Sequence, residues 1–169
     1  KYLEPSQRTE TVQLEYLDGA QPIQSINDPV LRHPGQWSRP NASLLIYIAN
    51  DISRYIKNPA LIAGFDLDHT LIHNRSGETF SRGIDDVMLM PNRREVLQDL
   101  IRRGYTVVIF TNQSSRSEKE TDSKFARVDY ALKLLNLPVI LMMATAKDQY
   151  RKPGVAMWHE LLKLIPTVD

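Results

Sequence analysis

The chain has 169 residues, a formal net charge of +1 and no cysteine. This length predicts one domain with a modest core, and the lack of cysteine excludes disulfide frameworks and thiolate metal sites. A charge so close to zero excludes binding of nucleic acid through the whole surface, so any such contact has to be local. No run approaches the roughly 18 consecutive apolar residues that cross a bilayer, and no membrane contact is expected.

The first part of the chain differs in composition from the rest. Residues 1–42 contain five prolines, from Pro5 to Pro40, and several Gly, Asn, Asp and Ser residues, which favour extended and turn structure over helix. Only residues 12–17 alternate like a short strand. We expect an extended arm or linker over 1–42 and one domain over 43–169. Because the chain starts at Lys1 and stops just after an apolar helical pattern, we also expect it to be part of a longer polypeptide.

From residue 43 onward, apolar runs alternate with helical patterns. Strands are predicted at 44–48, 61–65, 105–110 and 137–143, and helices at about 91–104, 119–136 and from 153 onward. Apolar runs without polar alternation suit strands that are covered on both faces. The pattern predicts an α/β fold with a doubly wound, mostly parallel sheet. In such sheets ligands bind beyond the carboxyl ends of the strands.

Two carboxylates follow the strand at 61–65. Asp66 and Asp68 are separated by one residue, and burial of such a pair is costly unless a cation or a function offsets the charge. An ionised Asp66 could attack phosphorus and form an aspartyl-phosphate, and Asp68 could protonate the leaving oxygen and then deprotonate water. Mg²⁺, which prefers oxygen ligands, would join carboxylate and phosphate. The alternative is a turn capped by two aspartates.

Two weaker signals follow later strands. Thr111 and Asn112 end the strand at 105–110 and could receive phosphate oxygens, although these residue types commonly end strands. Lys152, in a Tyr-Arg-Lys-Pro stretch, could neutralise a transferred phosphoryl group, although a basic residue before a helix is usually solvated surface. The order of the three signals along the chain is more specific than any one of them.

This order resembles the first three motifs of the haloacid dehalogenase superfamily. Further elements are similar to the DNA 3′-phosphatase domain of the polynucleotide kinase/phosphatase family: the segment around Asp66, Arg-Ser-Gly at 75–77, Val-Ile-Phe-Thr-Asn-Gln at 108–113, Tyr-Arg-Lys-Pro at 150–153 and Met-Trp at 157–158. The resemblance covers roughly residues 44–165. It implies a haloacid-dehalogenase-like (Rossmannoid) fold that lacks its last strand or strands in this chain.

The resemblance also implies a function and a set of site residues. The function is Mg²⁺-dependent removal of a 3′-phosphate from nucleic-acid ends, with DNA favoured over RNA, as in strand-break repair. Asp66 would be the nucleophile and Asp68 the general acid/base, with both as metal ligands, while Thr111 and Lys152 would complete the catalytic set. The implied substrate-binding residues are Thr70, Arg75, Ser76, Phe80, Asn112 and Arg151. Arg151 could equally be surface charge, and Phe80 could pack inside a flap.

Two departures from the family pattern keep an alternative open. His69 stands where the family usually has Gly, and the fourth, acidic motif that completes Mg²⁺ coordination is absent up to Asp169. The alternative is an inactive phosphatase-like scaffold in a larger assembly, with a protein partner bound through residues 1–42. A phosphatase acting on small molecules would not account for the Arg-Ser-Gly and Tyr-Arg-Lys-Pro elements. An intracellular location, in the nucleus or mitochondrion of a eukaryote, is expected.

Overall fold

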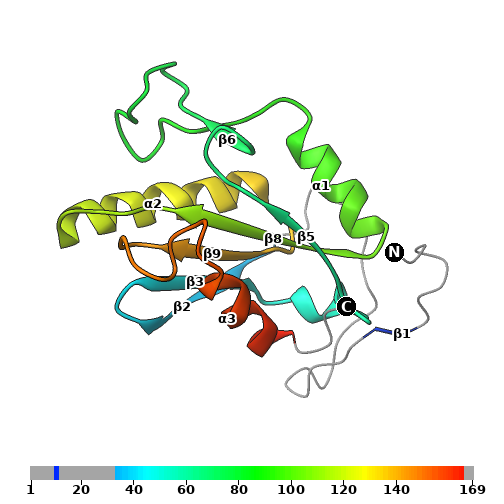
Figure 1. Ribbon diagram of the computed structural model, residues 1–169. Helices are drawn as coiled ribbons and strands as arrows, with labels where there is room; N and C mark the ends of the chain where they lie inside the picture. Colours follow the sequence, from blue (N-terminus) through cyan, green and yellow to red (C-terminus); the bar gives the residue numbers. More distant parts are fainter. Residues whose placement is uncertain (1–9, 12–32, 166–169) are drawn as a thin grey trace.

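A five-stranded mixed sheet forms the centre of the molecule (Figure 1). The computed structural model describes residues 10–11 and 33–165. Three neighbouring strands are parallel, with β8 between β5 and β9, and two further strands extend the sheet in antiparallel fashion beyond β9. The order across the sheet is β2 (Gly35–Asn41), β3 (Leu44–Ala49), β9 (Ile140–Ala144), β8 (Tyr105–Asn112) and β5 (Leu61–Phe65). The predicted α/β class is confirmed.

Three helices cover the sheet. Figure 1 shows α1 (Arg93–Arg102) and α2 (Glu118–Leu135) on one face and α3 (Ala156–Leu164) on the other. Ser117 caps α2 by accepting a hydrogen bond of 3.2 Å from the backbone N–H of Glu120. Gly104, with a φ of +89°, follows α1, and glycine adopts this conformation without steric cost. The predicted helices therefore form with small shifts at their ends.

The remaining elements are short. A 3-10 turn and the two-residue strand β4 (Lys57–Asn58) lie between β3 and β5, and β4 pairs with β1 (Glu10–Thr11). The turn spans Ile52–Arg54. After β5, the antiparallel pair of β6 (Ile72–His73) and β7 (Met88–Leu89) carries residues 74–87, which we call the flap. The flap projects beyond the sheet in Figure 1.

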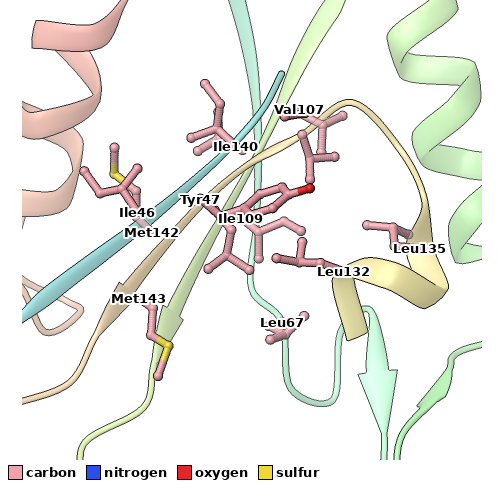
Figure 2. Packing of buried hydrophobic residues seen from close by; sticks show 14 of the residues in the cluster. Ile46, Tyr47, Leu67, Val107, Ile109, Leu132, Leu135, Ile140, Met142 and Met143 are labelled. Atoms are coloured by element: carbon pink, nitrogen blue, oxygen red, sulfur yellow. The ribbon is translucent and has the colours of Figure 1, made fainter. Parts of the chain in front are cut away.

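The core lies between the sheet and its helices, and Figure 2 shows part of it. Leu132 of α2 lies beside Ile109 and Tyr47 of the sheet, whereas Ile46 and Met142 lie together on the other side. All five residues of β9 are buried, as expected for a strand covered on both faces. This strand begins at Ile140 and not at residue 137 as predicted, and Pro138 before it has no backbone N–H to donate to a ladder.

The sheet begins earlier than the boundary expected at residue 43. β2 is an edge strand that includes Pro40, and its register with β3 shifts between Ser38 and Asn41, which is where a sheet tolerates proline. Trp37 anchors this strand by packing edge-on against Phe125 of α2 and donating a hydrogen bond of 2.9 Å to Asp129. Because most residues of β2 are polar, the sequence shows no alternation of apolar and polar residues that would predict this strand. The strand predicted at 12–17 lies outside the described residues, and the arm before β2 stays a prediction.

Among the residues described, no helix is both long and apolar enough to pass through a membrane.

The central strand makes the first testable prediction. Ile109 is fully buried in β8, so Ile109→Ala should lower the free energy of unfolding by about 2–5 kcal/mol through lost burial and a residual cavity. Urea denaturation measures this change. Val96→Ala on α1 is the control, because Val96 is 45% exposed and its truncation should change stability by no more than about 0.5 kcal/mol. Equal effects in the two variants would contradict this packing.

Candidate active site

The polar residues that follow the parallel strands meet at one edge of the sheet. Asp66 comes directly after β5, Thr111 and Asn112 are the last residues of β8, and Lys152 lies in the loop after β9. Because β5, β8 and β9 are parallel, their carboxyl ends lie side by side. The tertiary structure thus brings four of the predicted residues together.

Asp66 forms an ion pair with Lys152. The Lys152 Nζ lies 2.7 Å from Asp66 Oδ1 and also donates a hydrogen bond of 2.7 Å to the carbonyl oxygen of Phe110. Asp66 Oδ1 accepts a further bond of 2.8 Å from the backbone N–H of Leu67. The Asp66 side chain is 50% exposed. A carboxylate held by one oxygen and open to solvent is accessible to a substrate.

Asn112 holds the backbone of Lys152. Its Oδ1 accepts from the Lys152 N–H at 2.9 Å, and its Nδ2 donates to the Lys152 carbonyl oxygen at 3.2 Å. These two hydrogen bonds fix the backbone of Lys152, from which its side chain extends, relative to β8. Asn112 was predicted to bind phosphate, and its side-chain amide is occupied by this structural role.

Asp68 is held between two donors. Gln113 Nε2 donates to Asp68 Oδ2 at 2.6 Å, and Arg127 Nη1 donates to Asp68 Oδ1 at 2.9 Å. Gln113 Nε2 also donates to the hydroxyl oxygen of Thr111 at 2.8 Å. Thr111 itself is 1% exposed, so its hydroxyl lies beneath the surface of the site. The two carboxylates of the motif thus have separate cationic partners.

Arg127 was not found from the sequence. It lies on α2, and its separation from Asp68 along the chain is 59 residues, so no local motif joins the two. Gln113 stands beside Thr111 and Asn112 in a stretch that was recognised, and it could have been added on that ground.

The flap is organised around Asp86. Ser76 donates to this carboxylate with its backbone N–H at 2.7 Å and its hydroxyl at 2.8 Å, and the Arg82 N–H donates at 2.9 Å. The hydrogen bond from Arg82, together with those from Ser76, lowers the pKa of Asp86 to about 2. Ser76, predicted to contact substrate, is thus engaged inside the flap. Arg75 and Phe80 are exposed on it, and Phe80 is 85% exposed, so it does not pack inside the flap.

A cavity of about 500 Å³ opens beside Asp68, between the flap and α2. Its walls combine acidic, basic and aromatic side chains, among them Asp68, His69, Phe80, Lys124 and Arg127. A volume in this range suits an organic ligand rather than a lone phosphate.

The two carboxylates also offer oxygen donors to a cation. Asp66 contributes an exposed carboxylate, which a hard cation such as Mg²⁺ prefers. Within the part of the chain that the structure describes, no cluster of three or more His, Asp or Glu residues could hold a metal ion. A cation here would therefore depend on one or two carboxylates, with the rest of its ligands from phosphate and water, which is a common arrangement for Mg²⁺.

A comparison with known protein families identifies the family of this chain. A family model described as "Polynucleotide kinase 3 phosphatase" matches residues 61–168, from the first residue of β5 onward. The chain belongs to this family. The matched segment includes the parallel strands β5, β8 and β9, the flap and every residue of the site described above.

Several proteins are similar in sequence to this member of the polynucleotide kinase 3 phosphatase family. An uncharacterized 20.8 kDa protein of Autographa californica nuclear polyhedrosis virus is 32% identical over 136 residues, covering 79% of this chain and 71% of the viral protein. The bifunctional polynucleotide phosphatase/kinase of Schizosaccharomyces pombe is 34% identical over 131 residues, 76% of this chain but 31% of the yeast protein. Polynucleotide 3′-phosphatase ZDP of Arabidopsis thaliana is 31% identical over 60% of this chain and 17% of the plant protein. The chain therefore spans only a part of the two enzymes.

Two solved structures share the fold. A protein from Mesorhizobium loti described as a HAD-like phosphatase superposes with a TM-score of 0.58 at 21% identity, over 79% of this chain and 68% of the other. The D,D-heptose 1,7-bisphosphate phosphatase of B. bronchiseptica, complexed with magnesium and phosphate, gives 0.51 at 21% identity, over 63% and 64%. These likenesses confirm the predicted haloacid-dehalogenase-like fold.

Two further predicted residues of the family site have partners of their own. The Thr70 carbonyl oxygen accepts a hydrogen bond of 2.9 Å from Arg93 Nε, which ties the loop after the motif to α1. Arg151 Nη1 donates to the Ser114 hydroxyl at 2.6 Å, so Arg151 is anchored beside the loop after β8 and is not an isolated surface charge. Their contacts with substrate stay predictions.

His69 occupies a position where the backbone favours glycine. Its φ is +58°, in the left-handed region that a side chain rarely adopts, and its N–H donates to the Ile72 carbonyl oxygen at 2.8 Å. This conformation gives a physical reason for the glycine expected at this position. The imidazole is exposed at the cavity wall, so the loop accommodates it without burying it.

The Asp86 network predicts an acid-sensitive flap. The pKa of Asp86 is about 2 in the folded protein against an ordinary value of 3.8, so its contribution to flap stability is fully present above about pH 4 and is lost as the pH falls through 2. Asp86→Asn should loosen the flap at neutral pH, because an amide nitrogen cannot accept the bonds from Ser76 and Arg82. Amide NMR signals of these two residues measure the change.

Asp85→Asn is the matched control, because Asp85 is the exposed neighbour of Asp86. Its amide signals in the flap should follow those of the parent at every pH. Unaltered flap signals in Asp86→Asn would show that the carboxylate does not organise this segment.

Proposed function

We propose that this chain is a phosphatase that removes the 3′-phosphate from DNA ends through an aspartyl-phosphate intermediate. The observation that carries the proposal is the pair of held carboxylates: Asp66 lies against Lys152 at 2.7 Å, and Asp68 is fixed separately by Gln113 and Arg127. Two carboxylates with different environments suit two different roles. Membership of the polynucleotide kinase 3 phosphatase family supports a polynucleotide as the substrate.

In the first step, an oxygen of Asp66 attacks phosphorus, and the bond between phosphorus and O3′ breaks. The electron pair of that bond goes to O3′, which takes a proton from the protonated Asp68. Lys152, paired with Asp66, is placed to balance the charge that develops on the phosphoryl oxygens. The products are a 3′-hydroxyl end and an aspartyl-phosphate, with Asp68 now a carboxylate.

In the second step, water attacks phosphorus and Asp68 takes its proton. The bond between phosphorus and the Asp66 oxygen breaks, which releases inorganic phosphate and restores the Asp66 carboxylate. The proton that Asp68 gave to the leaving group is thus regained. Ser114 and Arg151, which bond to each other beside the loop after β8, would receive phosphate oxygens.

Mg²⁺ is the cofactor that this oxygen-donor set fits. The Asp66 carboxylate and the backbone carbonyl of Asp68 would hold it, and when bound it would neutralise part of the phosphate charge. A structural relative was solved with magnesium and phosphate, which supports the same cofactor here.

The DNA end would enter from the side of Asp68. The general acid must face the leaving oxygen, so the terminal nucleoside lies on that side, where the cavity between the flap and α2 opens. Phe80 and Arg75 are both exposed on the flap, and on this proposal they would meet a base or a backbone phosphate. Action on DNA ends would place the protein where DNA is repaired, in the nucleus or mitochondrion of a eukaryotic cell.

Loss of the nucleophile is the direct test of this function. Asp66→Asn should lower release of phosphate from a 3′-phosphorylated oligodeoxynucleotide by at least about a thousandfold, because the amide cannot form the covalent intermediate. Malachite-green detection of phosphate, using the full-length protein, measures this. Asp122→Asn, an exposed position on α2, should behave as the parent.

If the parent protein releases no phosphate, and Asp66→Asn is indistinguishable from it, the proposed phosphatase activity is ruled out. In that case the phosphatase-like fold would serve as a scaffold, and removal of residues 1–32, which leaves β2 and Trp37 in place, should abolish the assembly. Faster release from sugar phosphates than from the oligonucleotide would instead assign a small-molecule phosphatase. A ribo-oligonucleotide in the same assay decides between RNA and DNA.

The metal is tested by removal. Treatment with EDTA should abolish release of phosphate, and Mg²⁺ in excess of the chelator should restore it, because two carboxylates and phosphate otherwise repel each other. The same release assay measures both. Undiminished activity after chelation and dialysis would exclude a dependence on Mg²⁺.

A further inference from the structure

One side chain links the proposed general acid/base to the flap. The guanidinium group of Arg127 donates with Nη1 to Asp68 Oδ1 at 2.9 Å and with Nη2 to Asn74 Oδ1, also at 2.9 Å. Asp68 belongs to the motif after β5, whereas Asn74 is the first residue of the flap. The two terminal nitrogens of one planar group therefore contact two segments whose relative position a catalytic cycle has to control.

Asn74 is a firm part of this link. It is 7% exposed, and its Nδ2 donates to the carbonyl oxygens of Glu78 at 2.8 Å and Thr79 at 3.4 Å within the flap. Because the amide nitrogen is engaged with these acceptors, the amide oxygen has to face Arg127. A shift of the flap backbone would therefore move the acceptor of the Arg127 Nη2 bond.

Arg127 is not explained by packing of α2 alone. Its side chain is only 13% exposed, and its Nε is buried without a hydrogen-bond partner among the described residues. Burial of a cation with one donor unsatisfied is unfavourable, and a helix that needed only to cover the sheet would place an apolar residue here. The hydrogen bonds of its two terminal nitrogens to Asp68 and Asn74 offset the cost of burying this cation.

We propose that Arg127 is a positioning residue that orients the Asp68 carboxylate toward the leaving oxygen and ties this orientation to the position of the flap. The inference rests on the proposed function. Gln113, the residue directly after β8, bonds the second oxygen of Asp68, so the carboxylate plane is fixed by donors from two segments of the chain. With the flap in place, the two terminal nitrogens of Arg127 bond to Asp68 and Asn74. With the flap displaced, it loses Asn74 and constrains Asp68 less.

The test compares two leaving groups. Proton transfer to O3′ of an oligonucleotide requires a well-placed general acid, worth about 10²- to 10⁴-fold in rate, whereas p-nitrophenolate leaves as a stable anion. Arg127→Met should lower kcat/KM for a 3′-phosphorylated oligodeoxynucleotide by about 10²-fold and change kcat/KM for p-nitrophenyl phosphate by no more than a few-fold. Arg127→Lys keeps the charge but can bond only one of the two partners, and should fall between Arg127→Met and the parent.

Binding is separated from chemistry in the same series. In an Asp66→Asn background, the affinity for the 3′-phosphorylated oligonucleotide should change by no more than a few-fold on Arg127→Met, because both terminal nitrogens of Arg127 are engaged by Asp68 and Asn74. Lys133→Met is the control, since Lys133 is a 74% exposed cation on the same helix that pairs with Asp129 and not with the site. Thermal unfolding of each variant checks that the fold is kept.

A separate set of variants tests the link between Arg127 and the flap. Asn74→Leu should reproduce part of the loss that is specific to the oligonucleotide, and the double variant Arg127→Met/Asn74→Leu should be no slower than Arg127→Met alone. Multiplying losses in the double variant would overturn the coupling.

Equal losses on both substrates would show a merely structural role for Arg127, and no loss on the oligonucleotide would likewise overturn the inference. Both outcomes leave the proposed function standing, because the parent would still release phosphate. A parent inactive on both substrates would remove the proposed function and this inference together.

Discussion

The structure depends on the requirement that two carboxylates at one end of a buried strand each find a cation. Asp66 finds Lys152, which follows β9, and Asp68 finds Arg127 on α2. Carboxylates this close in sequence would otherwise repel each other. Because the two cations come from different parts of the chain, the motif after β5 becomes stable only when the sheet and its helices are assembled around it.

β8 has a central place in meeting this requirement. Its apolar residues are buried between β5 and β9, and its last residues supply the contacts that set the site. The Phe110 carbonyl accepts from Lys152, Asn112 clasps the lysine backbone, and Gln113 reaches Asp68. A strand fixed on both edges and both faces holds such contacts with little freedom, which is what a preorganised charge site needs.

The flap is stabilised differently from the sheet. Few apolar residues hold it, and a single carboxylate, Asp86, gathers the hydrogen bonds of its backbone. Local polar networks of this kind are less stable than a buried core and allow a segment to move as a unit. Phe80 is exposed at the rim of the flap, whereas Asn74 is buried at its base and accepts a hydrogen bond from Arg127.

The sequence by itself determined the class of fold, the order of the longer strands and helices from residue 44 onward and the family, and it predicted site residues at the strand ends. Apolar runs and helix signals are local, and Asp66, Asp68, Thr111 and Lys152 are fixed to strand ends by chain order alone. Only the tertiary structure decided that polar residues 35–41 form an edge strand, that Ser76 is engaged within the flap and that Arg127 holds Asp68. These features depend on contacts between segments far apart in the chain, and such contacts follow from packing in space, which no local pattern encodes.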